Sequence, residues 1–133
     1  MLKTTIRNTT ATRIDVRAAA VWLRIAARAM KNDSGEVTLL FCGDALCVRY
    51  NRAWFGKDRP TDVISFPDGE DGYWGDILVN VRQARRQAAA LDIPLVQELK
   101  RLSVHGFLHL FGLDHTADRG EMELLQEKLV RRK

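Results

Sequence analysis

Apolar and polar residues recur along the chain with two different periods, which distinguish expected helices from expected strands. Short apolar or alternating runs indicate four strands, at residues 3–7, 37–41, 63–66 and 75–81. Apolar residues spaced three or four apart indicate five helices, at residues 12–30, 44–54, 82–91, 94–111 and about 122–129. This order predicts an α+β fold: a small mixed four-stranded sheet packed with about five helices in a single domain, residues 1–133.

The first expected helix has a recognisable start. Thr12-Arg13-Ile14-Asp15 fits a capping box, in which the Thr12 side chain accepts from free amides of the first turn. The apolar stripe behind it comprises Val16, Ala20, Leu23, Ala27 and Met30. Pro94 suits the first turn of a later helix, because its fixed φ is already helical.

Composition narrows the class of protein only slightly. The chain has 46% hydrophobic and 29% charged residues, which is ordinary for a globular protein. No apolar run approaches the length of a membrane helix and no secretory signal is visible, so we expect a cytoplasmic protein that does not bind membranes. Cys42 and Cys47 are therefore expected to be buried free thiols. The net charge of +4 favours polyanions only mildly.

All three histidines fall within the segment His105-Gly106-Phe107-Leu108-His109-Leu110-Phe111-Gly112-Leu113-Asp114-His115. His105 and His109 lie one helical turn apart, so their imidazoles leave the same face and can share one ion. Gly112 can end the helix, and the returning chain can then supply His115 as a third nitrogen. Three neutral imidazoles around one zinc ion leave a fourth position for water, which is typical of a catalytic site. Another divalent metal would fit the same donors.

The alternative is that these histidines are ordinary core residues, which is the usual role of a single buried histidine. Three at this spacing, with a helix-ending glycine between the last two, favour the metal site. The spacing also matches the metzincin protease pattern, except that the general-base glutamate of that pattern is replaced by Gly106. Peptide hydrolysis is therefore disfavoured.

The histidine segment closely resembles the H-G-x-L-H-L-x-G-Y-D-H signature of the YbeY family of bacterial endoribonucleases and rRNA maturation factors. A second block, residues 51–67, is similar to the family's N-x-x-Y-R-x-K-D-x-P-T-D-V-L-S-F-P. Gly75-Asp76-Ile77 and Glu121-Met122 also match in the expected order. Leu113 replaces the usual Tyr of the signature.

The resemblance implies a zinc-dependent endoribonuclease that cuts single-stranded RNA in 16S rRNA 3′-end maturation and ribosome quality control. It implies one zinc per chain on His105, His109 and His115. Expected partners are rRNA and the ribosome or its proteins, and DNA is not expected. The alternative is a zinc-stabilised RNA-binding factor of ribosome assembly with little turnover. Phe55 supports this alternative, because it stands where the family commonly has an arginine. An apolar ring cannot hold a phosphate as a guanidinium can.

Other candidates are weaker. Lys57 and Arg59 are the expected RNA-backbone contacts, although plain surface charges fit equally well. Trp54 or Phe55 could stack on an unpaired base, although a core or lid aromatic is the commoner use. Asp62 and Asp76 are expected to begin strands, where capping a turn is the commoner use and orienting a ligand histidine or serving as a base is the alternative. An exposed arginine face is expected at Arg82, Arg85 and Arg86.

Overall fold

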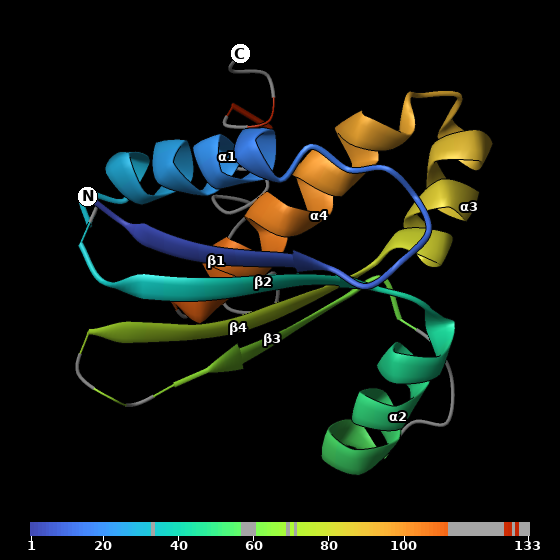
Figure 1. The fold of residues 1–133 in the computed structure, drawn as a ribbon, viewed down its shortest axis with the longest axis horizontal. Coiled ribbons are helices and arrows are strands. Elements are labelled where there is room, and N and C mark those ends of the chain that lie inside the picture. The colour runs from blue at the N-terminus through green and yellow to red at the C-terminus, as the bar shows by residue number, and fades with distance from the viewer. Residues whose placement is uncertain are drawn as a thin grey trace.

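One mixed four-stranded sheet organises the fold (Figure 1). The computed structural model describes residues 1–32, 34–56, 61–68, 70, 72–111, 127, 128 and 130. Its strands are β1 (Lys3–Asn8), β2 (Glu36–Cys42), β3 (Val63–Pro67) and β4 (Tyr73–Asn80), in the order β1-β2-β4-β3. The first three in this order run parallel, and β3 pairs antiparallel with β4 at the edge. The predicted mixed sheet is confirmed.

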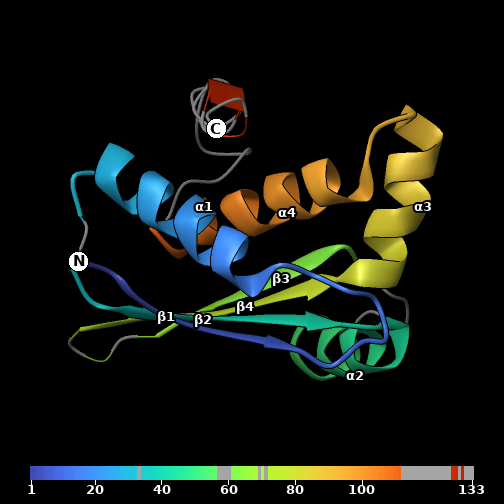
Figure 2. The ribbon, with the colours of Figure 1, turned by 45° about the horizontal axis from the view of Figure 1, so that its top comes forward.

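Helices cover the two faces of the sheet unequally. The helices are α1 (Val16–Ala29), α2 (Asp44–Phe55), α3 (Val81–Leu91) and α4 (Leu95–Leu110). Figure 2 shows α1, α3 and α4 on one side of the sheet and α2 alone on the other. The described residues therefore hold four helices, which corrects the expected count of about five. The fifth was expected near residues 122–129, which lie largely outside the described residues.

The main core lies between the sheet and helices α1 and α4. In β2 the alternation of a strand sends Val37, Leu39 and Phe41 into this core, and Leu40 and Cys42 to the α2 face. A smaller cluster joins Cys42 and Cys47 to the apolar residues under α2. Both cysteines are buried free thiols, as predicted, with their sulfurs 3.2 Å apart. Within the described residues, no helix has the length and apolar character needed to cross a membrane.

The start of α1 differs from the prediction. Asp15, not Thr12, is the N-cap, and its Oδ1 accepts from the amides of Arg17 and Ala18. Thr12 lies too far upstream for this role because the helix begins only at Val16, and its hydroxyl instead accepts from Arg85. The buried face is correspondingly shifted: Val16 is exposed, and the buried residues are Ala19, Trp22, Leu23, Ala26 and Ala27.

Candidate metal centre and its cleft

His105 and His109 project from the last turns of α4 into one cleft. Their Nε2 atoms lie 2.9 Å apart, and their rings meet at an interplanar angle of 60°. Both side chains are half-buried. The cleft has a volume of about 380 Å³. The predicted pairing of these two imidazoles on one helix face is present.

The two imidazoles suit a shared metal ion. Two nitrogens that bind one tetrahedral zinc at the usual bond length lie about 3.3 Å apart. The observed 2.9 Å is close enough for a small side-chain rotation to reach that value. The third expected ligand, His115, lies outside the described residues, so zinc binding stays a prediction.

Gly106 brings the histidine helix unusually close to the sheet. A Cβ atom at this position would lie 2.6 Å from Cγ2 of Ile77 and 2.9 Å from Cγ2 of Val63. The hydroxyl of Ser65 donates to the carbonyl oxygen of Gly106 at 2.8 Å. The glycine therefore allows α4 to pack tightly against β3 and β4, and this packing directs His105 and His109 beside the edge strand.

The edge strand β3 runs along the cleft, with α4 on one side and α2 on the other. The cleft is lined by Asn51, Phe55, Thr61, Asp62, Val63, Ile64, Ser65, Pro67, His105 and His109. Asp62 immediately precedes β3, and its Oδ1 accepts from the amide of Val63 at 2.8 Å, so it caps the strand start as expected. A carboxylate thus shares the cleft with the two imidazoles.

Asp76 does not begin a strand, contrary to the prediction, because β4 already starts at Tyr73. Its carboxylate lies on the α2 face of the sheet and accepts from the hydroxyl of Tyr73. The lining of the cleft with the histidines includes Asp62, just before β3, and not Asp76.

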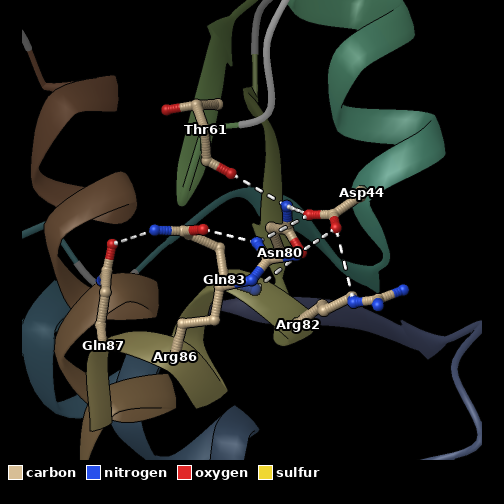
Figure 3. Close-up of polar contacts among 7 residues, drawn as sticks. All are labelled: Asp44, Thr61, Asn80, Arg82, Gln83, Arg86 and Gln87. Atoms are coloured by element: carbon tan, nitrogen blue, oxygen red, sulfur yellow. Dashed lines mark hydrogen bonds and ion pairs between the residues drawn. The ribbon is translucent and has the colours of Figure 1, made fainter. Parts of the chain in front are cut away.

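A buried asparagine holds the elements around the cleft together (Figure 3). Asn80 is fully buried at the end of β4, and its Nδ2 donates to Oδ1 of Asp44 at 2.9 Å and to the carbonyl oxygen of Thr61 at 3.1 Å. Its Oδ1 caps α3 by accepting from the amide of Gln83. The backbone N–H of Asn80 donates to the carbonyl oxygen of Asp62. One side chain therefore joins the start of α2, the approach to β3 and the start of α3.

The predicted exposed arginine face has intramolecular partners. Arg86 contacts both carboxylate oxygens of Asp44, at 3.2 and 2.5 Å, and Nε of Arg82 lies 3.6 Å from the same carboxylate (Figure 3). The hydrogen bond from Arg86, more than any other contact, lowers the pKa of Asp44 below its usual range. These arginines secure α3 to α2, which leaves less of their charge for a nucleic acid.

Two exposed aromatic residues end α2, and the second, Phe55, lines the cleft. Trp54 and Phe55 are 66% and 54% exposed, so neither is a core residue. Lys57 and Arg59, the expected RNA contacts, lie outside the described residues. Both belong to the segment that joins Phe55 to Thr61, two residues that line the cleft.

Sequence reasoning assigned no role to three polar residues that build this site. Ser65 and Asn51 line the cleft, and Asn80 is the buried link described above. The available signal was their position: Ser65 interrupts an apolar strand, and Asn80 ends one just before a helix. A polar residue at such a place usually has a specific partner.

The fold and site define an α+β protein with a pair of imidazoles in a cleft along the edge of a mixed sheet. The chain belongs to the YbeY family: the family model described as Endoribonuclease YbeY matches residues 4–133. It is 35% identical over 99 residues to "Endoribonuclease YbeY" of Persephonella marina, an alignment that covers 70% of this chain and 65% of that protein. It is 41% identical over 104 residues to the protein of the same name from Allorhizobium ampelinum, and this alignment covers 71% of this chain and 62% of that protein.

A solved structure shares the fold. The solution structure of a Thermotoga maritima protein superposes with a TM-score of 0.71 at 26% identity, covering 96% of this chain and 86% of that one. The chain spans just under two thirds of the length of the two relatives named above.

Proposed function

We propose that the chain is a metal-dependent endoribonuclease that cuts single-stranded RNA and acts in 16S rRNA 3′-end maturation and ribosome quality control. The observation that carries this proposal is the pair of Nε2 atoms, 2.9 Å apart, in a cleft that follows an edge strand. Membership of a family described as Endoribonuclease YbeY supplies the class of substrate. Expected partners are rRNA and the ribosome or its proteins.

The residues that would hold the metal are His105, His109 and His115, with one zinc ion per chain. When bound, such an ion activates a water molecule and neutralises charge on a phosphoryl oxygen. Asp62 lines the same cleft, and its Oδ1 already accepts the amide of Val63, so its other oxygen is the candidate acceptor for the proton of the nucleophile. Lys57 and Arg59 would bind the RNA backbone, because their segment starts and ends at residues of the cleft.

One feature favours a second function, an RNA-binding factor of ribosome assembly with little turnover. Phe55 is more than half exposed at the rim of the cleft, where the family motif commonly has arginine. A phenyl ring gives no hydrogen bond to a phosphate, whereas a guanidinium gives two in a fixed geometry. RNA could therefore bind without efficient stabilisation of the charge that develops during cleavage.

Cleavage of a labelled, unstructured RNA separates the two functions. The purified full chain is compared with His109→Ala, and the zinc content of each is measured by elemental analysis. Val96→Ala serves as the matched control, since Val96 is 56% exposed near the first turn of the same helix. We expect stoichiometric metal and cleavage for the wild type and the control, and loss of both for His109→Ala.

A wild type that holds stoichiometric metal but cuts no faster than His109→Ala would refute the nuclease and favour the binding function. The cellular role is tested by mapping the 3′ end of 16S rRNA after loss of the protein. We expect unprocessed 3′ ends in cells that lack the protein. The wild-type gene should restore processing, and the His109→Ala gene should not. Normal ends in the absence of the protein would refute that role.

A further inference from the structure

Helix α2 leaves part of its face of the sheet uncovered. Beside it lies a groove of about 610 Å³, separate from the histidine cleft. Its lining includes Tyr50, Trp54 and Phe55 from α2, Phe66 from β3, and the carboxylates of Asp68 and Asp76. The groove and the histidine cleft share Phe55, Ser65 and Pro67, so the two cavities adjoin at the edge strand. A ligand long enough to span β3 could occupy both.

The wall of the groove is a set of aromatic rings open to solvent. Trp54 meets Phe66 edge-on at a centroid distance of 5.5 Å, and Tyr50 lies 5.7 Å from the same ring. Trp54 is nevertheless 66% exposed and Phe55 54% exposed. Exposed aromatic rings held in place by an underlying ring form the kind of platform on which unpaired bases stack.

The floor of the groove has a carboxylate positioned by an irregularity of β4. Glu36 pairs with Tyr73 and Val37 with Gly75, so Trp74 is an extra residue in the ladder. Residues three apart in a regular strand point to opposite faces, but this bulge allows the hydroxyl of Tyr73 to donate to Oδ1 of Asp76. Within the part of the chain that the structure describes, Oδ2 of Asp76 has no hydrogen-bond partner.

The hydroxyl of Tyr73 stays a donor at neutral pH. Burial, and next the hydrogen bond to Asp76, raise the pKa of Tyr73 above its usual range. The same hydroxyl lies 2.7 Å from Oγ1 of Thr38, so the carboxylate is held by a short chain of hydroxyls. A fixed carboxylate with a spare oxygen is an acceptor for N–H groups of a ligand.

We propose that this groove binds one unpaired RNA base that carries an exocyclic amino group, stacked on Trp54 and donating to Asp76. Adenine, cytosine and guanine have such a group; uracil lacks it and offers only its N3–H, which lies between two carbonyl oxygens that a carboxylate repels. Asp68 and Asp76 also disfavour phosphate in the groove, so the base enters it while the adjoining backbone reaches the histidine cleft. This proposal rests on the proposed function, because it assumes that RNA is the ligand.

Binding of short oligonucleotides by the full chain tests the proposal. The probes are fluorescein-labelled 2′-O-methyl octamers of uridine, either uniform or with one central A, C or G, and their integrity is checked on a gel after the anisotropy measurement. We expect the wild type to bind the A, C and G probes about five- to tenfold more tightly than uniform U. In Asp76→Asn the affinities for all four probes should agree within about twofold. In Trp54→Ala the affinity for every probe should fall about tenfold.

Two variants outside the groove are the controls. Asp92→Asn removes the same charge at the end of α3, and Leu91→Ala removes an exposed apolar side chain beside it. Both should bind as the wild type does. Trp54→Ala is informative even if Asp76→Asn folds poorly, because Trp54 is largely exposed and its loss spares the core.

Three results would overturn the proposal: equal binding of all probes by the wild type, an unchanged preference in Asp76→Asn, or unchanged affinity in Trp54→Ala. Binding of an arginine-rich peptide that requires Trp54 and Asp76, without any base preference, would assign the groove to a protein partner instead. The cleavage assay tests the nuclease proposal separately from the groove. Base preference without cleavage supports the groove and refutes the nuclease, and cleavage without base preference does the reverse.

Discussion

The hydroxyl of Ser65 donates to the carbonyl oxygen of Gly106 at 2.8 Å and so joins the edge strand β3 to the helix that carries both described histidines. Helical carbonyls normally accept only from their own helix, so this bond adds a partner where α4 touches the sheet. Gly106 makes the contact possible because it has no side chain. The position of the imidazoles beside β3 therefore depends on two residues that are not themselves ligands.

Gly106→Ala should destabilise the protein by about 1–3 kcal/mol, the usual cost of overpacking a close contact. The added methyl group would lie 2.6 Å from Ile77 and 3.1 Å from Oγ of Ser65, so α4 must move away from the sheet. Urea unfolding measures the loss. Gly43→Ala is the control, because a Cβ there has no atom within 4 Å. Equal effects of the two substitutions would contradict the packing argument.

Phe55→Arg should raise the rate of single-stranded RNA cleavage about tenfold, since a guanidinium at the rim can stabilise charge on the phosphate. Ala53→Arg is the matched control: it adds the same charge to α2 at a residue that does not line the histidine cleft. Initial rates at several salt concentrations separate a local contact from general attraction. If both variants gain equally, the effect is long-range and Phe55 has no special role.

Glu98→Ala should cost about 2–3 kcal/mol, because it removes a buried charged acceptor and leaves the donors of Arg101 and Gln87 without it. Glu98 is fully buried on α4, where it accepts two hydrogen bonds of 2.6 Å from Arg101 and one of 2.7 Å from Gln87 on α3. Glu98→Gln keeps the shape and an acceptor, so we expect a smaller loss, about 1–2 kcal/mol. Urea midpoints provide the comparison, with Glu70→Ala as the exposed-loop control. A Glu98→Ala variant as stable as that control would show that the ion pair adds nothing.

Asp44→Asn should lower stability at pH 7, and this loss of stability should shrink progressively as the pH falls below about 4. The pKa of Asp44 is lower in the folded protein, chiefly because Arg86 hydrogen-bonds to its carboxylate. The stabilisation is therefore present above the unfolded pKa of about 3.9 and is lost as the pH falls through the folded value. Chemical unfolding of both proteins between pH 7 and pH 3 measures the difference, which should also narrow in 1 M salt. A difference that stays constant over this range would exclude the carboxylate charge as its cause.

Local sequence patterns predict the elements well but not their contacts. The four strands and the first four helices occur in the predicted order, because period-2 and period-3.6 patterns reflect burial directly. The pairing of His105 and His109 was equally predictable, since it needs only one helix. The cap of α1 was not, because Thr12 and Asp15 both suit an N-cap and only the observed helix start distinguishes them.

The contacts that shape the cleft join residues far apart in the sequence. Asn80 reaches Asp44 across 36 positions, and Ser65 reaches Gly106 across 41. No single-sequence pattern specifies which distant groups will meet, because that depends on how the sheet and helices pack as a whole. The groove beside α2 is of the same kind: it exists because α2 covers only part of its face of the sheet.

The direction in which position 106 points has a consequence for protein engineering. On sequence alone, one substitution, Gly106→Glu, would complete a protease-like zinc motif in this chain. A side chain at this position would instead enter the narrow space between α4 and the strands, against Ile77 and Val63, and bury an unpaired charge there. This single substitution would therefore not place a general base beside the histidine pair. A peptidase built on this fold would need its general base from another element.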